Sequence, residues 1–164
     1  MKPMSKRDKI NFTIIGVFVL LMTIGFIANL YDNYKKDAQI KNAFYSEDYN
    51  GLEIKAYDVR FDKDSDTGNV VINVDMQFNN TLDTSFEPDF LLANLGKSIS
   101  FTPQGDLGDK ITGNTSVIGT VVGYTDVKDR ANLKNVTLEF FVHDMSTDDS
   151  PHAVTIKIPD KYFE

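Results

Sequence analysis

The chain has 164 residues, a formal net charge of −7, two histidines and no cysteine. This length supports one ordinary domain with at most a small additional element. The lack of cysteine excludes a disulfide framework, a thiolate metal site and a cysteine nucleophile. The acidic balance argues against a nucleic-acid partner, because most of the surface would repel phosphates.

The first feature along the chain is an uncharged apolar run, NFTIIGVFVLLMTIGFIANLY, at residues 11–31. As a helix it would be about 31 Å long, which matches the ~30 Å hydrocarbon core of a bilayer. Its β-branched and glycine residues suit a helix in lipid, where unpaired backbone groups cost more than weak helix propensity. The pattern predicts a transmembrane helix over residues 12–31 after a basic cytoplasmic tail, residues 1–11.

A cleaved secretory signal is the main alternative for this segment. Such signals have shorter apolar cores and end in small residues in an A-x-A-like pattern. The run ends instead in GFIANL at residues 25–30, which favours retention as a signal anchor. Gly16 and Gly25 are candidates for close packing of the helix against other helices.

The charges that flank the apolar run predict its orientation. The positive-inside rule counts Lys and Arg near the ends of the span. Four precede the run (Lys2, Lys6, Arg7 and Lys9) and three follow it (Lys35, Lys36 and Lys41). The count favours a single-pass protein of the cell membrane with an extracytoplasmic C-terminal domain.

Residues 32–50 are predicted to form a stalk between the membrane and the C-terminal domain. Asp32 with Lys36, and Asp37 with Lys41, are i,i+4 pairs of opposite charge. Such pairs support a helix, so we expect the stalk to be partly helical.

Beyond residue 50 the apolar period changes to two, which is typical of β-strands. Between residues 70 and 79 apolar side chains occupy one face and polar ones the other, and residues 136–142 and 154–158 repeat the pattern. Leu52, Ile54 and Ala56 alternate out of phase with Val59 and Phe61, which predicts a bulge or a strand break near Tyr57. Further candidate strands are 90–95, 97–102 and 115–124.

About seven short strands separated by turn-rich connections describe a two-sheet sandwich better than an open sheet. We therefore predict an all-β, immunoglobulin-like sandwich over residues 51–164, preceded by a single transmembrane helix.

The acidic loop at residues 62–68, DKDSDTG, invites a calcium hypothesis through Asp62, Asp64 and Asp66, because hard cations prefer oxygen ligands. An EF-hand loop needs Gly at its sixth position and Glu at its twelfth, where this chain has Thr67 and Asn73. A solvated hairpin loop is the favoured interpretation, and no cofactor is predicted. Asp64 remains a candidate for contact with a partner.

Phe141 and His143 are further candidates for partner contact, because both lie on the polar face of their predicted strand. His152 in the next strand is expected opposite His143, as a pH-sensitive surface pair. His143 and Asp144 lack a G-x-S-x-G nucleophile elbow, so no catalytic residue is predicted and the protein is not expected to be an enzyme.

Two segments resemble the immunoglobulin-like surface domains of Gram-positive bacteria that belong to the domain-of-unknown-function 4352 family. One is the strand end VDMQFNN at residues 74–80, and the other is ITGNTSVIGTVV at residues 111–122. The chain departs from the family at Thr112, where Pro is common, and at Tyr124, where Phe is usual. The resemblance spans roughly residues 51–158 and implies an extracytoplasmic sandwich without known catalytic residues.

The sequence therefore predicts a membrane-anchored, non-catalytic binding module of the bacterial cell envelope, with the lipid bilayer and an envelope protein as partners. Tethering would raise its effective concentration near a membrane partner. The alternative is a small bitopic subunit of a secretion, conjugation or pilin-like machine. Similarity to type IV pilin N-termini is lost at Asn11 and Gly16, where those proteins have Gly and Glu.

Overall fold

The computed structural model describes residues 6–90 and 99–164. The chain divides after Gln39 into two compact units. The first consists of most of helix α1 (Lys6–Lys41), and the described residues of the second form eight β-strands. Three short 3-10 helices occur among the strands: η1 (Gly105–Gly108), η2 (Arg130–Asn132) and η3 (Asp160–Tyr162).

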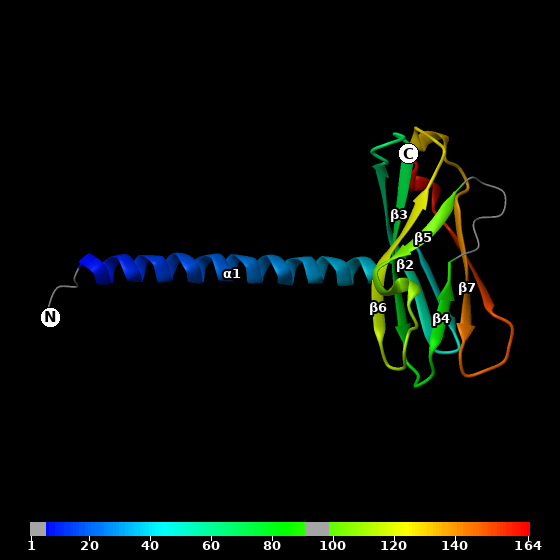
Figure 1. Ribbon diagram of the computed structural model, residues 1–164, viewed down its shortest axis with the longest axis horizontal. Helices are drawn as coiled ribbons and strands as arrows, with labels where there is room; N and C mark the ends of the chain where they lie inside the picture. The colour runs from blue at the N-terminus through cyan, green and yellow to red at the C-terminus, as the bar shows by residue number, and fades with distance from the viewer. Residues whose placement is uncertain (1–5, 91–98) are drawn as a thin grey trace. The chain divides into compact units, whose positions relative to one another are not determined.

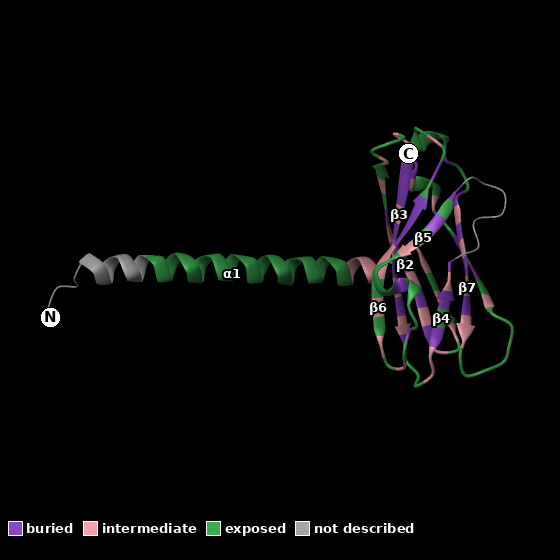
Figure 2. Ribbon diagram, in the orientation of Figure 1, coloured by how far each residue is buried: buried purple, intermediate pink, exposed green. Residues whose placement is uncertain are grey.

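Helix α1 includes the whole apolar run. From residue 14 to residue 37 every side chain is exposed, as Figure 2 shows by colour. The part of the helix from Ile14 to Lys41 is long and apolar enough to cross a membrane, by length and composition. The prediction of a long apolar helix is confirmed.

The strands form two antiparallel sheets (Figure 1). The larger sheet has the order β1-β2-β3-β6-β5 and the smaller one the order β4-β7-β8. The strands of the larger sheet are β1 (Tyr45–Tyr49), β2 (Leu52–Lys63), β3 (Val70–Asn80), β6 (Ser116–Tyr124) and β5 (Ser100–Gln104). Those of the smaller sheet are β4 (Phe86–Asp89), β7 (Thr137–Asp144) and β8 (His152–Lys157).

The strand order identifies the sandwich as immunoglobulin-like. Strands β2-β3-β6-β5 and β4-β7-β8 reproduce the A-B-E-D and C-F-G sheets of constant-type immunoglobulin domains. Strand β1 adds one edge strand next to β2. The predicted fold class is confirmed.

The core lies between the two sheets and is built from the alternating apolar faces of their strands. Phe78 of β3 and Phe140 of β7 meet edge to face across it, with ring centroids 5.9 Å apart. Phe90 stacks on Phe140 at 4.6 Å. Burying a large apolar side chain contributes about 1.5–3 kcal/mol, so the side chains between the sheets stabilise the sandwich.

The predicted phase change in β2 is a β-bulge. Ala56 pairs with Met76 and Asp58 pairs with Asp75, so Tyr57 is the extra residue. The shift turns Val59 back toward the core, where it is buried like Ile54. The bulge therefore explains the slip in the alternation and confirms its predicted place.

The predicted stalk over residues 32–50 is wrong in its second half. The helix continues to Lys41, and Tyr45–Tyr49 forms β1, which pairs with β2 through a two-residue hairpin turn. The turn residues Asn50 and Gly51 both have positive φ, as a type I′ turn requires. The sandwich therefore includes β1 and begins before residue 51.

The strand predicted at residues 90–95 is also displaced. The structure places β4 at Phe86–Asp89, and residues 91–95 of the prediction lie outside the described part of the chain. The other candidate strands agree with β5, β6, β7 and β8 to within a few residues.

The two sequence segments that carried the family resemblance lie side by side in β3 and β6, and Asn80 meets the turn before β6 at one end of the ladder. Asn80 ends β3 and is almost fully buried. Its amide donates to the carbonyl oxygens of Thr84 at 2.7 Å and Thr112 at 3.0 Å, and its Oδ1 accepts from the Leu82 N–H at 3.0 Å. A Cβ added to Gly113 would lie 2.7 Å from the Cα of Asp83. The two segments thus form one structural clamp between the β3–β4 loop and the turn before β6.

Candidate binding groove

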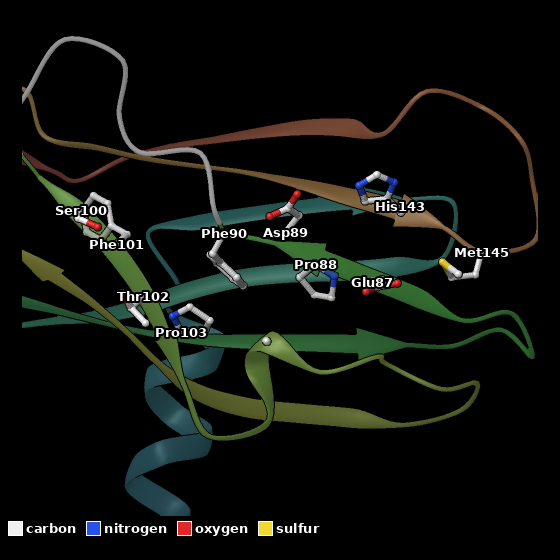
Figure 3. A pocket seen from close by; sticks show the side chains of 11 residues that line it. Glu87, Pro88, Asp89, Phe90, Ser100, Phe101, Thr102, Pro103, His143 and Met145 are labelled. Atoms are coloured by element: carbon white, nitrogen blue, oxygen red, sulfur yellow. The ribbon is translucent and has the colours of Figure 1, made fainter.

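A groove of about 710 Å³ lies between β4 and β5 (Figure 3). These are edge strands of different sheets, so the groove opens where the two layers of the sandwich part. A volume of 300–1,000 Å³ is usual for ligand sites. The described residues that line it are Glu87, Pro88, Asp89, Phe90, Ser100, Phe101, Thr102, Pro103, Gly108, His143 and Met145.

The backbone of β4 presents the Pro88 carbonyl to this edge. Phe86 exchanges two hydrogen bonds with Ile111, on the side of β4 away from β7. Hydrogen-bonding directions alternate along a strand, so the Pro88 carbonyl also points away from β7. Proline has no N–H, which is why it is tolerated at this edge position. The groove side of β4 therefore offers an acceptor and no donor at Pro88.

Strand β5 carries a second proline on the opposite side of the groove. Pro103 pairs with Val121 of β6 and, like Pro88, has no N–H to donate. Prolines on two facing edge strands oppose the addition of a further strand. Recognition in this groove must therefore depend on side chains rather than on a β-ladder.

The floor of the groove is apolar and fixed by the core. Phe90 rests on Phe140, and Phe101 covers Gly123 of β6, where an added Cβ would lie 2.4 Å from the Phe101 ring. Met145 at one end is 50% exposed, and its flexible thioether adapts to different ligand shapes. Figure 3 shows Phe90 and Phe101 on opposite sides of the groove.

Among the described residues that line the groove, the charged ones are carboxylates. Glu87 and Asp89 both belong to β4. Glu87 is exposed and pairs across the ladder with His143 of β7. Among the described residues, Glu87 takes part in no ion pair. The groove thus combines an apolar floor with an electronegative wall.

The structure brings one of the predicted contact residues into this groove. His143 lines it, whereas Phe141 lies opposite Asp89 in the β4–β7 ladder and is half-buried. The predicted pairing of His143 with His152 is wrong, because the register places His152 opposite Val142. Neighbouring residues of a strand point to opposite faces, so the two imidazoles face different sides of the sheet.

The Asp64 side chain accepts hydrogen bonds from its own loop. Its Oδ1 accepts from the Thr67 N–H at 2.8 Å, the Thr67 hydroxyl at 2.8 Å and the Asp66 N–H at 3.1 Å. The hydrogen bonds from Thr67 lower the pKa of this carboxyl below its ordinary value. Asp64 therefore stabilises the hairpin loop between β2 and β3.

The calcium candidates do not converge on one point. Asp62 accepts from the side chain of Asn73, and Asp66 accepts from the Ser65 hydroxyl. No three Asp, Glu or His side chains in the described part of the chain group as metal ligands. Asp62 and Asp66 therefore both take part in hydrogen bonds within this hairpin.

A polar cluster that the sequence did not predict joins β1 to β8. Glu47 lies 2.7 Å from His152 Nε2 and also accepts a hydrogen bond from the Tyr45 hydroxyl. The ring of Tyr49 stacks on His152 at 4.2 Å. Burial opposes ionisation of Glu47, but the hydrogen bonds from Tyr45 and His152 outweigh it and lower the pKa of Glu47. Burial and the contact with Glu47 raise the pKa of Tyr45.

Gly16 and Gly25 do not share one face of α1. They are nine residues apart, which is two and a half turns of an α-helix, so they lie on opposite sides. Both positions are open, with nothing within 4 Å of an added Cβ. A single neighbouring helix can contact only one of them.

The comparisons with known proteins return similar folds at low identity. No family model and no curated protein matches the chain. Among solved structures, the yeast GGA1 GAE domain-P21 structure is 18% identical, with a TM-score of 0.44, and covers 69% of this chain and 96% of its own. The GAE domain of GGA2p from Saccharomyces cerevisiae is 20% identical, with a TM-score of 0.43 and coverages of 70% and 96%. Structural similarity with TM-scores of 0.44 and 0.43 supports no conclusion about function. The strand order of the two sheets is what identifies the immunoglobulin-like fold.

Proposed function

We propose that this protein is a membrane-anchored, non-catalytic interaction module of the bacterial cell envelope, with its sandwich outside the membrane. The exposed apolar surface of α1 is the observation that carries the proposal. A soluble protein rarely leaves a large contiguous apolar patch uncovered, whereas lipid provides the environment that such a helix requires.

The residues that follow the apolar run support a membrane boundary at this point. Tyr31 and Tyr34 are 67% and 73% exposed on α1, and Lys35 and Lys36 come directly after them. Tyrosine is enriched at membrane interfaces, and lysine places its charge among headgroups. This order of residues fits a helix that leaves the bilayer near Tyr31.

The sandwich supports a binding role rather than a catalytic one. Immunoglobulin-like folds host many functions, so the role must be argued from the site. The groove between β4 and β5 has an apolar floor and two carboxylates, a composition suited to recognition. Segments 74–80 and 111–122 add a resemblance to a family of extracytoplasmic surface domains.

Charge insertion tests the anchor. Leu21→Lys with Ile24→Lys places two charges near the centre of the span, at a cost of about 6 kcal/mol for insertion. Tyr34→Lys is the matched control, because this position lies at the proposed interface. We expect the control to stay in the carbonate-resistant membrane fraction and the double variant to leave it. Retention of both variants would contradict a membrane-spanning α1.

A further inference from the structure

We propose that the groove between β4 and β5 binds a segment of a partner protein that presents a lysine or arginine side chain next to an apolar one. This inference rests on the proposed function, because it names the chemistry of the partner that the module would recognise. Three features of the groove support it: the Pro88 carbonyl on its edge, the charge of its wall and its apolar floor.

The edge of β4 selects for a donor. The Pro88 carbonyl points away from β7, because hydrogen-bonding directions alternate along a strand and Phe86, two residues earlier, directs both of its hydrogen bonds to Ile111. Proline has no N–H, so β4 offers no donor at this position. A ligand that approaches this position gains a hydrogen bond only by donating one. Lysine and arginine side chains are donors without acceptor capacity.

The wall of the groove selects for positive charge. Glu87 is exposed and belongs to the groove lining together with Asp89. No lysine or arginine is among the described residues of the lining. A cation placed against Glu87 would therefore meet an attractive potential and a hydrogen-bond acceptor at once.

The floor provides the apolar half of the site. Phe90 and Phe101 are fixed by Phe140 and Gly123, so the floor is formed before a ligand arrives. A preformed apolar floor lowers the entropic cost of binding. The exposed Met145 at the end of the groove gives an apolar ligand side chain a flexible surface to pack on.

The prolines exclude the most common alternative mode of peptide binding. Extended peptides often add to an open sheet edge through backbone hydrogen bonds. Pro88 and Pro103 each remove a donor that such a ladder would use. The occupant is thus recognised by its side chains, with the cation against Glu87 and an apolar group over Phe90 and Phe101.

Peptide selection on the full-length protein tests the inference. The chain in lipid nanodiscs is panned against a random 12-residue peptide library displayed on phage, with empty nanodiscs as the subtraction step. We expect enrichment of peptides that carry Lys or Arg beside an apolar residue. Enrichment of acidic or charge-free peptides, or no enrichment, would overturn the inference.

Binding of the most enriched peptide, made synthetically, is then measured against charge variants. Glu87→Lys reverses the charge of the groove wall and should weaken binding by up to about fivefold, given the usual worth of an exposed ion pair. Asp66→Lys makes the same change in the exposed β2–β3 loop and should leave affinity unchanged. Equal affinities of Glu87→Lys and the unchanged protein would place the peptide elsewhere and refute the groove assignment.

These outcomes separate the inference from the proposed function. A peptide that binds outside the groove contradicts the groove chemistry and leaves an interaction module in place. If α1 does not hold the chain in the membrane, the proposed function is contradicted. The affinities of the groove variants for the peptide still test whether the groove binds it.

Discussion

Asn80 offers the sharpest test of how the sandwich is held together. Its side chain makes three hydrogen bonds, to the Thr84 carbonyl, the Thr112 carbonyl and the Leu82 N–H. Asn80→Ala removes all three and leaves those backbone groups without that partner in a buried position. A buried group that loses its partner costs about 1–3 kcal/mol, and partial access of water to the loops lowers the total. We expect the free energy of unfolding to fall by about 3 kcal/mol.

The neighbouring residue provides the control. Asn79 precedes it in the same strand, with its side chain on the outer face, and is half-buried, so Asn79→Ala should change stability by less than about 0.5 kcal/mol. Urea unfolding of the full chain in detergent is followed by tyrosine fluorescence, because the chain has seven Tyr and no Trp. Equal midpoints for the two variants would refute the reasoning that Asn80 clamps two loops.

Two further variants test contacts elsewhere in the sandwich. The pKa of Glu47 is lowered in the folded state. The stability that Glu47 contributes is therefore present above its unfolded pKa and is lost as the pH falls through its folded pKa. In Glu47→Gln the free energy of unfolding should decrease less between neutral and acidic pH than in the unchanged protein. Unfolding in urea at a series of pH values from 7 to 3 measures this, and an unchanged pH profile would contradict the Glu47–His152 contact. Gly113→Ala should destabilise by about 2 kcal/mol or more, since its Cβ would press on the Asp83 backbone, whereas Gly25→Ala, in open space on α1, should not destabilise. Equal thermal midpoints for these two glycine variants would count against close packing at Gly113.

The sequence predicted those strands whose inward residues are aliphatic. Val70, Ile72 and Val74 alternate without interruption, and β3 follows them as expected. The bulge at Tyr57 was also predictable from the sequence, because a single extra residue shifts the alternation of apolar and polar side chains along a strand. Patterning of this kind decides fold class, which is why the two-sheet sandwich was predictable.

Strand β1 was missed because its inward residues are polar or aromatic. Tyr45, Glu47 and Tyr49 face the interior beside Ile54, where an apolar pattern would be expected. The signal that would have revealed the strand is Asn50-Gly51, a dipeptide typical of two-residue hairpins. The i,i+4 charge pairs that end at Lys41 predicted a helical stalk, and its end was placed at residue 50 although β1 begins at Tyr45.

The binding groove depends on tertiary relations that local patterns do not contain. Pro88 lowers the strand signal of β4, so the predicted strand began at Phe90. The register of β7 against β8 places His152 opposite Val142, and no sequence period fixes which residues of two strands face each other. The approach of β4 to β5 is likewise set by the packing of the two sheets.

The orientation of the chain in the membrane decides whether the sandwich lies outside the cell. Because the protein has no cysteine, single-cysteine variants can be labelled without background. Ser65→Cys lies in the exposed β2–β3 loop, and Ser5→Cys lies in the basic tail. A membrane-impermeant maleimide is applied to intact cells of a Gram-positive host and, as a control, to lysed cells. We expect Ser65→Cys to be labelled in intact cells and Ser5→Cys to be labelled only after lysis. Labelling of Ser65→Cys only after lysis would place the sandwich in the cytoplasm and contradict an extracytoplasmic sandwich.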